Sequence, residues 1–308
     1  MGISVGGINI AFSGELDDSF EEAFRGLFAR RYLPDVSKAS GDFHVLIERF
    51  KGESFRVFSA VYDHEGKDEY KIESGVPSPY SNEAPVFFLL QAVARAGAKL
   101  GRIFITDSVG ILKEDGTAIL FIGYPHTGKS TMSVLAMVHG LTVLSTENTV
   151  IEVRNDKLYI VSGTEILVYD PRIEEVYGVR APYDERTRSG YRIKEINDAE
   201  RRNALRKGVE IDTIVLLHAA FNCGKASFSP IRGRKVRKTL WYFSTALMKG
   251  LDYYEPMPLH VPMNNEITQN LKLFLETASR NYSNKMFEAF GNHRDVFEMA
   301  LRLNHFGL

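Results

Sequence analysis

The sequence has little that points to a disulfide framework, a zinc cluster or a membrane segment. Its 308 residues include one cysteine, Cys223, which cannot form an internal disulfide. Cysteine and histidine nowhere recur at the spacing of a zinc site. No apolar run approaches the roughly 18 residues that a membrane span needs. The first residues lack the basic start and long apolar stretch of a secretory signal, so we expect a cytoplasmic protein with no membrane partner.

An excess of positive charge is also missing. The 38 Lys and Arg residues are balanced by 39 Asp and Glu residues, which leaves a net charge of -1. Such a balance does not favour non-specific attraction to a nucleic-acid backbone. The short basic run RGRKVRK at 232–238 is followed by apolar residues at helical spacing, a pattern typical of a helix with one buried face. We therefore expect no nucleic-acid partner.

What is present is the alternation of strand-like and helix-like segments found in a mixed α/β protein. We expect a boundary near residue 100, with an N-terminal α/β domain over 1–100, whose role the sequence does not assign, and a second domain over 101–308. The apolar patterns predict strands at 3–12, 43–50, 54–63, 117–123, 141–145, 149–153, 157–163 and 211–221. They predict helices at 17–33, 85–100, 129–140, 197–207, 236–250, 266–280 and 293–306.

One sequence motif indicates a chemical function. The segment GYPHTGKS, Gly123 to Ser130, fits the pattern G-x-x-x-x-G-K-[ST] without a mismatch. Glycines allow backbone N–H groups to surround a phosphate, the lysine places a positive charge on the β and γ oxygens, and the serine hydroxyl can ligate Mg²⁺. The apolar run TAILFI comes directly before the loop and an apolar helix pattern begins at Lys129, which is the context that the motif requires.

The motif predicts which residues contact a nucleotide. This set is Gly123, His126, Thr127, Gly128, Lys129, Ser130 and Thr131. A phosphate loop also needs a carboxylate near its Mg²⁺, usually at the end of a neighbouring apolar strand. Glu147 follows the apolar run LTVLS and is the best candidate, so we expect Ser130 and Glu147 to hold the metal. Asp107 ends the strand-like run RIFIT and is a second candidate for a catalytic carboxylate.

The loop and the segments around it resemble a known family. The segment FIGYPHTGKSTMSVLAMVHGLTVLSTEN, residues 121–148, resembles the phosphate-loop region of HPr kinase/phosphorylases and their relatives with the phosphoenolpyruvate-carboxykinase type of nucleotide fold. The resemblance covers about residues 104–170 and extends weakly to 220. It implies a kinase domain with ATP and Mg²⁺ as cofactors, in which Lys129 binds phosphate and acidic residues hold the metal and accept the hydroxyl proton.

The chain departs from the family pattern at two positions. The family's acid pair falls on Thr146 and Glu147, so one acid is retained, and its upstream histidine falls near Ser108, beside Asp107. No copy of the Glu-Ile-Arg-Gly signature is found, which disfavours the carrier protein HPr as substrate. The resemblance therefore implies a divergent kinase that phosphorylates another hydroxyl, on a small molecule such as a hydroxy amino acid or on a seryl side chain.

Several alternatives stay open. A nucleotide-binding regulatory protein or slow NTPase would keep the phosphate loop without a hydroxyl acceptor, and a carboxykinase would add a metal site that the sequence does not show. The arginine-rich segment GVRAPYDERTRSGYR could place Arg180, Arg186 and Arg188 beside the phosphates or an acidic substrate. The donor nucleotide, the acceptor, the identity of the general base and self-association of the chain are left open.

Overall fold

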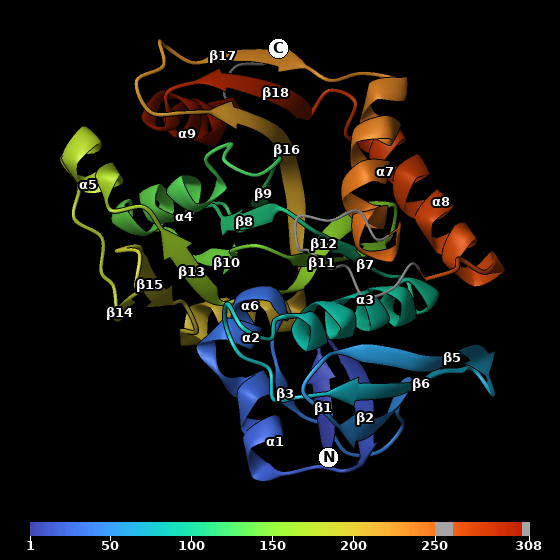
Figure 1. Cartoon of the computed structure of the whole chain (residues 1–308). Helices are drawn as coiled ribbons and strands as arrows, with labels where there is room; N and C mark the ends of the chain where they lie inside the picture. Colours follow the sequence, from blue (N-terminus) through green and yellow to red (C-terminus); the bar gives the residue numbers. More distant parts are fainter. Residues whose placement is uncertain (250–260, 304–308) are drawn as a thin grey trace. The chain divides into compact units, whose positions relative to one another are not determined.

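The computed structural model describes residues 1–249 and 261–303 and shows a mixed α/β protein (Figure 1). The chain divides into two compact units, Met1–Phe104 with Ser244–Leu271, and Ile105–Phe243 with Lys272–Leu308. Strand β7 (Arg102–Ile105) carries the chain across the first division, a few residues beyond the boundary expected near 100. Unlike the expected domains, the first unit also includes a segment from the C-terminal third. The ends of two predicted helices, 250 and 304–306, lie outside the described residues.

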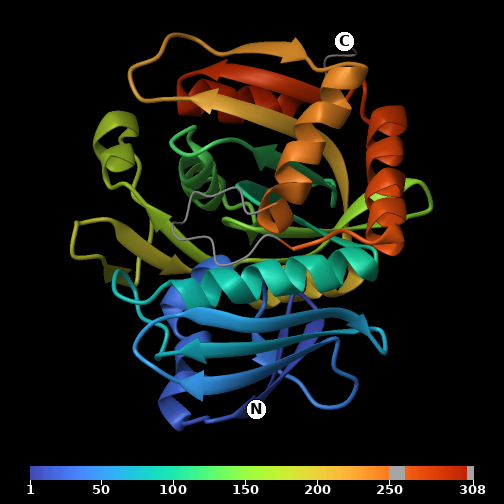
Figure 2. The same ribbon diagram turned by 45° about the vertical axis from the view of Figure 1, so that its right-hand side comes forward.

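The first unit is built on a sheet with strand order β3-β1-β2-β4-β6-β5. Helix α3 lies along one face of this sheet (Figure 2), and its buried residues run from Pro85 to Ala98. The strands are β1 (Gly2–Val5), β2 (Ile8–Gly14), β3 (Ser37–Lys38), β4 (Val45–Lys51), β5 (Arg56–His64) and β6 (Lys67–Ser74), and the helices are α1 (Asp18–Arg25), α2 (Leu27–Tyr32) and α3 (Ala84–Lys99).

Two predictions in this unit were wrong in detail. The segment 3–12 is not one strand, because Gly6 and Gly7 take φ values of 58° and 80° and turn it into the β1–β2 hairpin. Such values are open to glycine at no steric cost, so Gly-Gly is a hairpin signal. The helix predicted at 17–33 is divided between α1 and α2, because Gly26 is extended, with ψ 160°.

The second unit contains a larger sheet with the local strand order β10-β8-β9-β16-β12-β11. Its central strands β9, β16 and β18 run parallel to one another, while β8, β10, β11, β12 and β17 pair in antiparallel fashion. These strands are β8 (Ser108–Leu112), β9 (Ala118–Ile122), β10 (Val143–Ser145), β11 (Thr149–Arg154), β12 (Lys157–Gly163), β16 (Val209–Ala219), β17 (Ser227–Pro230) and β18 (Met286–Gly291). The sequence patterns do not predict β17 or β18.

Parallel pairing places three chain segments at one edge of the sheet. The carboxyl ends of β9, β16 and β18 lead into the Gly123–Ser130 loop, the segment after Ala219 and helix α9 (His293–Arg302) respectively. Helices α4 (Lys129–Val138) and α9 pack against each other and contribute, with strands of this sheet, to one apolar core. Ligands of open α/β sheets bind at such an edge.

The charged segment 170–210, where the sequence predicted only a short helix, contains more structure. Strands β14 (Glu185–Arg186) and β15 (Arg192–Glu195) form a small sheet of order β13-β15-β14 with the preceding strand β13 (Ile166–Tyr169). Helix α5 (Arg172–Tyr177) lies between β13 and β14 in the chain, and α6 (Ala199–Lys207) follows β15. The described residues also form helices α7 (Arg234–Lys249) and α8 (Asn265–Asn281). Among the described residues, no helix combines the length and apolar character needed to cross a membrane.

Candidate phosphate site

The phosphate loop joins the last residue of β9 to the first residue of α4, as the motif predicts. Gly128 is the N-cap of α4 with a φ of 97°, which disfavours residues that carry a Cβ. At Gly123, a Cβ would lie 2.4 Å from Thr127 Oγ1. Thr127 closes the loop by donating from Oγ1 to the Tyr124 carbonyl at 2.7 Å. Its own carbonyl accepts from the Ala219 N–H at 3.1 Å, so the loop is attached to the end of β16.

The remaining predicted loop residues lie in the first turn of α4 and in the exposed part of the loop. Ser130 and Thr131 lie in the first turn of α4 and are half-buried, where the helix N-terminus favours an anion. His126 has a φ of 64° and an exposed side chain. The glycines therefore shape the loop, and the first turn of α4 supplies its backbone N–H groups.

The ammonium of Lys129 is held by three oxygen atoms. Nζ donates to the carbonyls of Gly123 at 2.7 Å and Tyr124 at 2.9 Å, and it lies 2.9 Å from Asp107 Oδ1. The two side chains of the ion pair are 8% and 5% exposed, so the charges are screened little by solvent. Because an ammonium has three hydrogens, a bound phosphate must replace at least one of these contacts.

Asp107 occupies a strained and incompletely satisfied position. Its φ of 52° is unusual for a residue with a side chain, and its carbonyl accepts from the Gly123 N–H at 3.1 Å, which attaches it to the start of the loop. Its second carboxylate oxygen, Oδ2, is buried and has no hydrogen-bond partner within residues 1–249 and 261–303. Leaving a charged acceptor buried and unpaired is costly, and such atoms are typical of ligand sites.

Glu147 lies on a second loop, between β10 and β11, beside Asp107. Its carbonyl accepts from the N–H of Ser108 at 2.9 Å, so the two candidate carboxylates belong to adjoining backbone segments. The buried hydroxyl of Thr164 accepts from three successive N–H groups in this loop, those of Thr146 at 3.3 Å, Glu147 at 2.8 Å and Asn148 at 3.0 Å. This clamp fixes the backbone from which the half-buried Glu147 extends.

The other flank of the loop is formed by His293 and Tyr177, which no sequence pattern indicates. The His293 ring packs so closely on Gly128 that a Cβ there would lie 2.5 Å from Cδ2 and 2.7 Å from Nε2. Tyr177 Oη accepts from the His293 N–H at 3.1 Å and lies 3.0 Å from Nδ1. Burial lowers the pKa of His293 to about 4, so the ring is neutral at pH 7. His293 follows β18, and the parallel pairing of β18 with β16 places it at this edge.

The predicted substrate arginines are not brought to the loop. Arg186 contacts Tyr183 from β14 at 2.7 Å, Arg188 lies in the turn before β15, and Arg180 is exposed. No contact described in the structure joins any of the three to residues 123–130. A different arginine is linked to this flank by ring contacts: the Arg172 guanidinium covers the Phe221 ring at 5.2 Å, and Phe221 packs on His293 at 4.6 Å.

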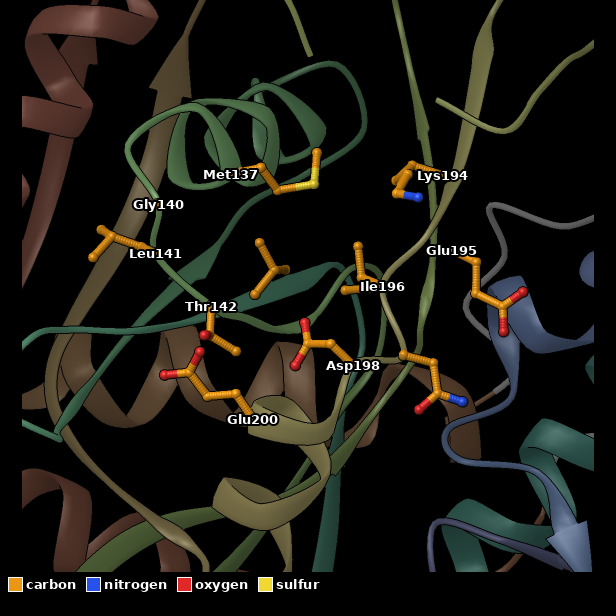
Figure 3. A pocket seen from close by; sticks show the side chains of 11 residues that line it. Met137, Gly140, Leu141, Thr142, Lys194, Glu195, Ile196, Asp198 and Glu200 are labelled. Carbon is orange, nitrogen blue, oxygen red and sulfur yellow. The ribbon is translucent and has the colours of Figure 1, made fainter. Parts of the chain in front are cut away.

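A cavity of about 520 Å³ lies at the opposite end of α4 (Figure 3). Met137, Leu141, Val143 and Ile196 give it an apolar part, and Asp198 and Glu200 give it acidic groups. Helix geometry places it about 15 Å from the loop, since α4 rises by about 1.5 Å per residue. The cavity is therefore separate from the phosphate site.

Comparison with known proteins adds no relative: no protein-family model matches the chain, and no curated protein matches its sequence. The HPr kinase-like resemblance of residues 121–148 stays a prediction. Among the described residues, no group of three or more His, Cys, Asp or Glu side chains is arranged to hold a metal ion. A Mg²⁺ that accompanies a nucleotide needs fewer protein ligands, because phosphate oxygens and water complete its octahedron.

Proposed function

We propose that this protein is an ATP- and Mg²⁺-dependent phosphotransferase of the HPr kinase-like type, which moves a γ-phosphoryl group to an alcohol. The observation that carries the proposal is the pair formed by Lys129 and Asp107 at the phosphate loop. A lysine that a phosphate can attract lies 2.9 Å from a carboxylate whose second oxygen is buried without a partner. Binding of a nucleotide would draw Lys129 toward phosphate and release Asp107 for the chemical step.

Each residue has a defined part in this proposal. The loop N–H groups and Lys129 bind the phosphates, and Ser130 with Glu147 would hold Mg²⁺, which supplies positive charge to the phosphate oxygens. The acceptor oxygen bonds to the γ-phosphorus as the bond to the β-γ bridging oxygen breaks, and ADP leaves. The hydroxyl proton passes to the carboxylate of Asp107 or Glu147. Positioning and charge neutralisation provide most of the rate enhancement.

One observation favours a second function, a nucleotide-binding regulatory protein or slow NTPase. Thr146 stands where the resembling family has its first acid, and its buried hydroxyl lies 3.0 Å from the Ile166 carbonyl and 3.2 Å from Thr164 Oγ1. The side chain is thus used in the fold and does not replace a carboxylate. A site with one fewer acid would hold nucleotide and react slowly with water.

The test is ADP production from Mg²⁺ and ATP with serine, threonine, homoserine and simple polyols as acceptors. We expect one acceptor to stimulate turnover and to appear phosphorylated in stoichiometric amount with ADP. ATP binding without stimulation by any acceptor would favour the regulatory function or a protein substrate. Absence of binding by ATP, ADP, GTP and pyrophosphate alike would refute both functions.

The general base is identified by comparing Asp107→Asn with Glu147→Gln. The substitution that removes the base should lower kcat by at least about 100-fold and flatten the acidic limb of the kcat profile against pH. The other should mainly raise the Mg²⁺ concentration required for half-maximal rate. Glu114→Gln, in the exposed turn before β9, is the matched control and should change neither. Equal, pH-independent losses in both variants would exclude either residue as the base.

A further inference from the structure

His293 is placed to be part of the phosphate site rather than a packing residue of helix α9. Its side chain is 2% exposed, yet it is polar and packs on Gly128, the glycine that precedes Lys129. Of its two ring nitrogens, Nδ1 contacts Tyr177 Oη at 3.0 Å. Within the described residues, the structure gives Nε2 no hydrogen-bond partner, and Nε2 is the nitrogen beside Gly128.

The contacts of Tyr177 favour one of the two neutral tautomers of His293. The hydroxyl accepts from the His293 N–H, at the positive end of α9, and the arrangement in which it donates its own hydrogen to Nδ1 uses both its donor and its acceptor. Nδ1 is then the acceptor and Nε2 carries the hydrogen of the neutral ring. The N-terminus of α9 polarises the Tyr177 hydroxyl, and its hydrogen bond to Nδ1 makes the Nε2–H of the same ring a better donor. Two residues from different elements thus present one N–H beside the phosphate loop.

We propose that His293 binds the phosphate chain of the nucleotide by donating a hydrogen bond from Nε2, and that Tyr177 is the residue that positions it. This inference rests on the proposed nucleotide site. A neutral donor suits this place, because Lys129 already supplies a full charge and a second buried cation would carry a large desolvation cost. The site would then contact phosphate from the N-terminal ends of two helices, α4 and α9.

The test measures the affinity of the full chain for ATP, ADP and inorganic tripolyphosphate by calorimetry. His293→Phe keeps an aromatic ring against Gly128 but removes the donor, and we expect it to weaken all three ligands about tenfold, the size expected for a hydrogen bond to a charged acceptor. Tyr177→Phe should weaken them about threefold, and the double variant should bind no more weakly than His293→Phe alone. His139→Phe, at the far end of α4 with its ring packed on Phe297 at 5.2 Å, is the matched control and should leave affinity unchanged.

The outcomes separate this inference from the proposed function. Wild-type binding that is lost in Lys129→Ala but unaltered in His293→Phe overturns the role of His293 and leaves the nucleotide site standing. A loss for ATP with no loss for tripolyphosphate assigns His293 to the nucleoside, which also overturns the proposal. If His293→Phe fails to fold, ¹⁵N NMR of the wild-type imidazole replaces it. Tripolyphosphate should then shift the Nε2 resonance and slow exchange of its proton, and an unchanged resonance refutes the contact.

Discussion

Lys129 and Asp107 form a buried ion pair, with Nζ and Oδ1 2.9 Å apart, although 21 residues that include an entire strand–turn–strand unit lie between them. The pair exists because Asp107 ends the connection into β8 and Lys129 begins the helix after β9, and these two strands are neighbours in the sheet. It joins the lysine that we propose binds phosphate to the carboxylate that we propose for the chemical step.

Breaking this pair should destabilise the fold as well as remove function. Lys129→Ala leaves a nearly buried carboxylate without its counter-charge, a change that costs about 3–5 kcal/mol. The double variant Lys129→Ala/Asp107→Asn should recover most of that stability while remaining inactive. Urea unfolding followed by circular dichroism measures the first effect and ADP production the second. Equal unfolding free energies for Lys129→Ala and the wild type would show that the pair is not formed.

Substitution of Gly128 should lower the unfolding free energy by more than its backbone conformation alone explains. Gly128→Ala combines a φ of 97° with a Cβ placed 2.5 Å from His293 Cδ2. Gly116→Ala is the matched control, because it has a φ of 83° and no atom within 4 Å of the added Cβ. We expect a loss of about 1 kcal/mol in unfolding free energy for the control. For Gly128→Ala we expect about 3 kcal/mol, the strain plus the overpacking, with loss of nucleotide binding. Equal losses of unfolding free energy in Gly128→Ala and Gly116→Ala would show that the His293 ring is not in close contact with Gly128.

The clamp formed by Thr164 should control the position of Glu147. Thr164→Val keeps the shape of the side chain but removes the oxygen that accepts from three backbone N–H groups, and we expect a loss of about 2–3 kcal/mol. In Thr164→Ser the hydroxyl is retained, so most of the stability and turnover should return. Thermal unfolding and kcat are measured together. Full turnover in Thr164→Val would mean that Glu147 does not need this clamp.

Stability should depend on pH through His293. Burial lowers its pKa to about 4 from an ordinary value of 6.5. Between these values the unfolded chain binds a proton that the folded chain does not, so folding stability falls as the pH is lowered and is unaffected above pH 7. Between pH 7 and pH 5 the wild type should lose about 2 kcal/mol more than His293→Phe. The comparison cancels the contribution of His44, whose pKa burial also lowers. Parallel curves of unfolding free energy against pH for the wild type and His293→Phe would contradict a neutral, buried His293.

The outcomes along the chain show where sequence patterns succeed. Helix α3 matches the prediction for 85–100 within one residue at each end, because its apolar run is long and begins with Pro85 at the first turn. The division of 17–33 at Gly26 was not predicted, since a single glycine in an amphipathic pattern does not by itself end a helix. Strand β18, MFEAFG, is short, and its partner β16 lies about 70 positions earlier, so local propensity does not distinguish it.

The sequence by itself determined the phosphate loop, because strand, glycine-rich turn and helix are contiguous and each is encoded by its own residues. It also selected Asp107 and Glu147 as candidate carboxylates from their places after apolar strands. Only the tertiary structure decided that Asp107 pairs with Lys129, that Thr164 holds the Glu147 loop, and that His293 and Tyr177 lie beside Gly128 while the predicted arginines do not. These contacts join residues 17 to 165 positions apart. Antiparallel pairing of β8 with β9 and of β11 with β12 brings Asp107 to Lys129 and Thr164 to Glu147, and parallel pairing of β9, β16 and β18 brings His293 to the loop; no local pattern specifies which strands pair.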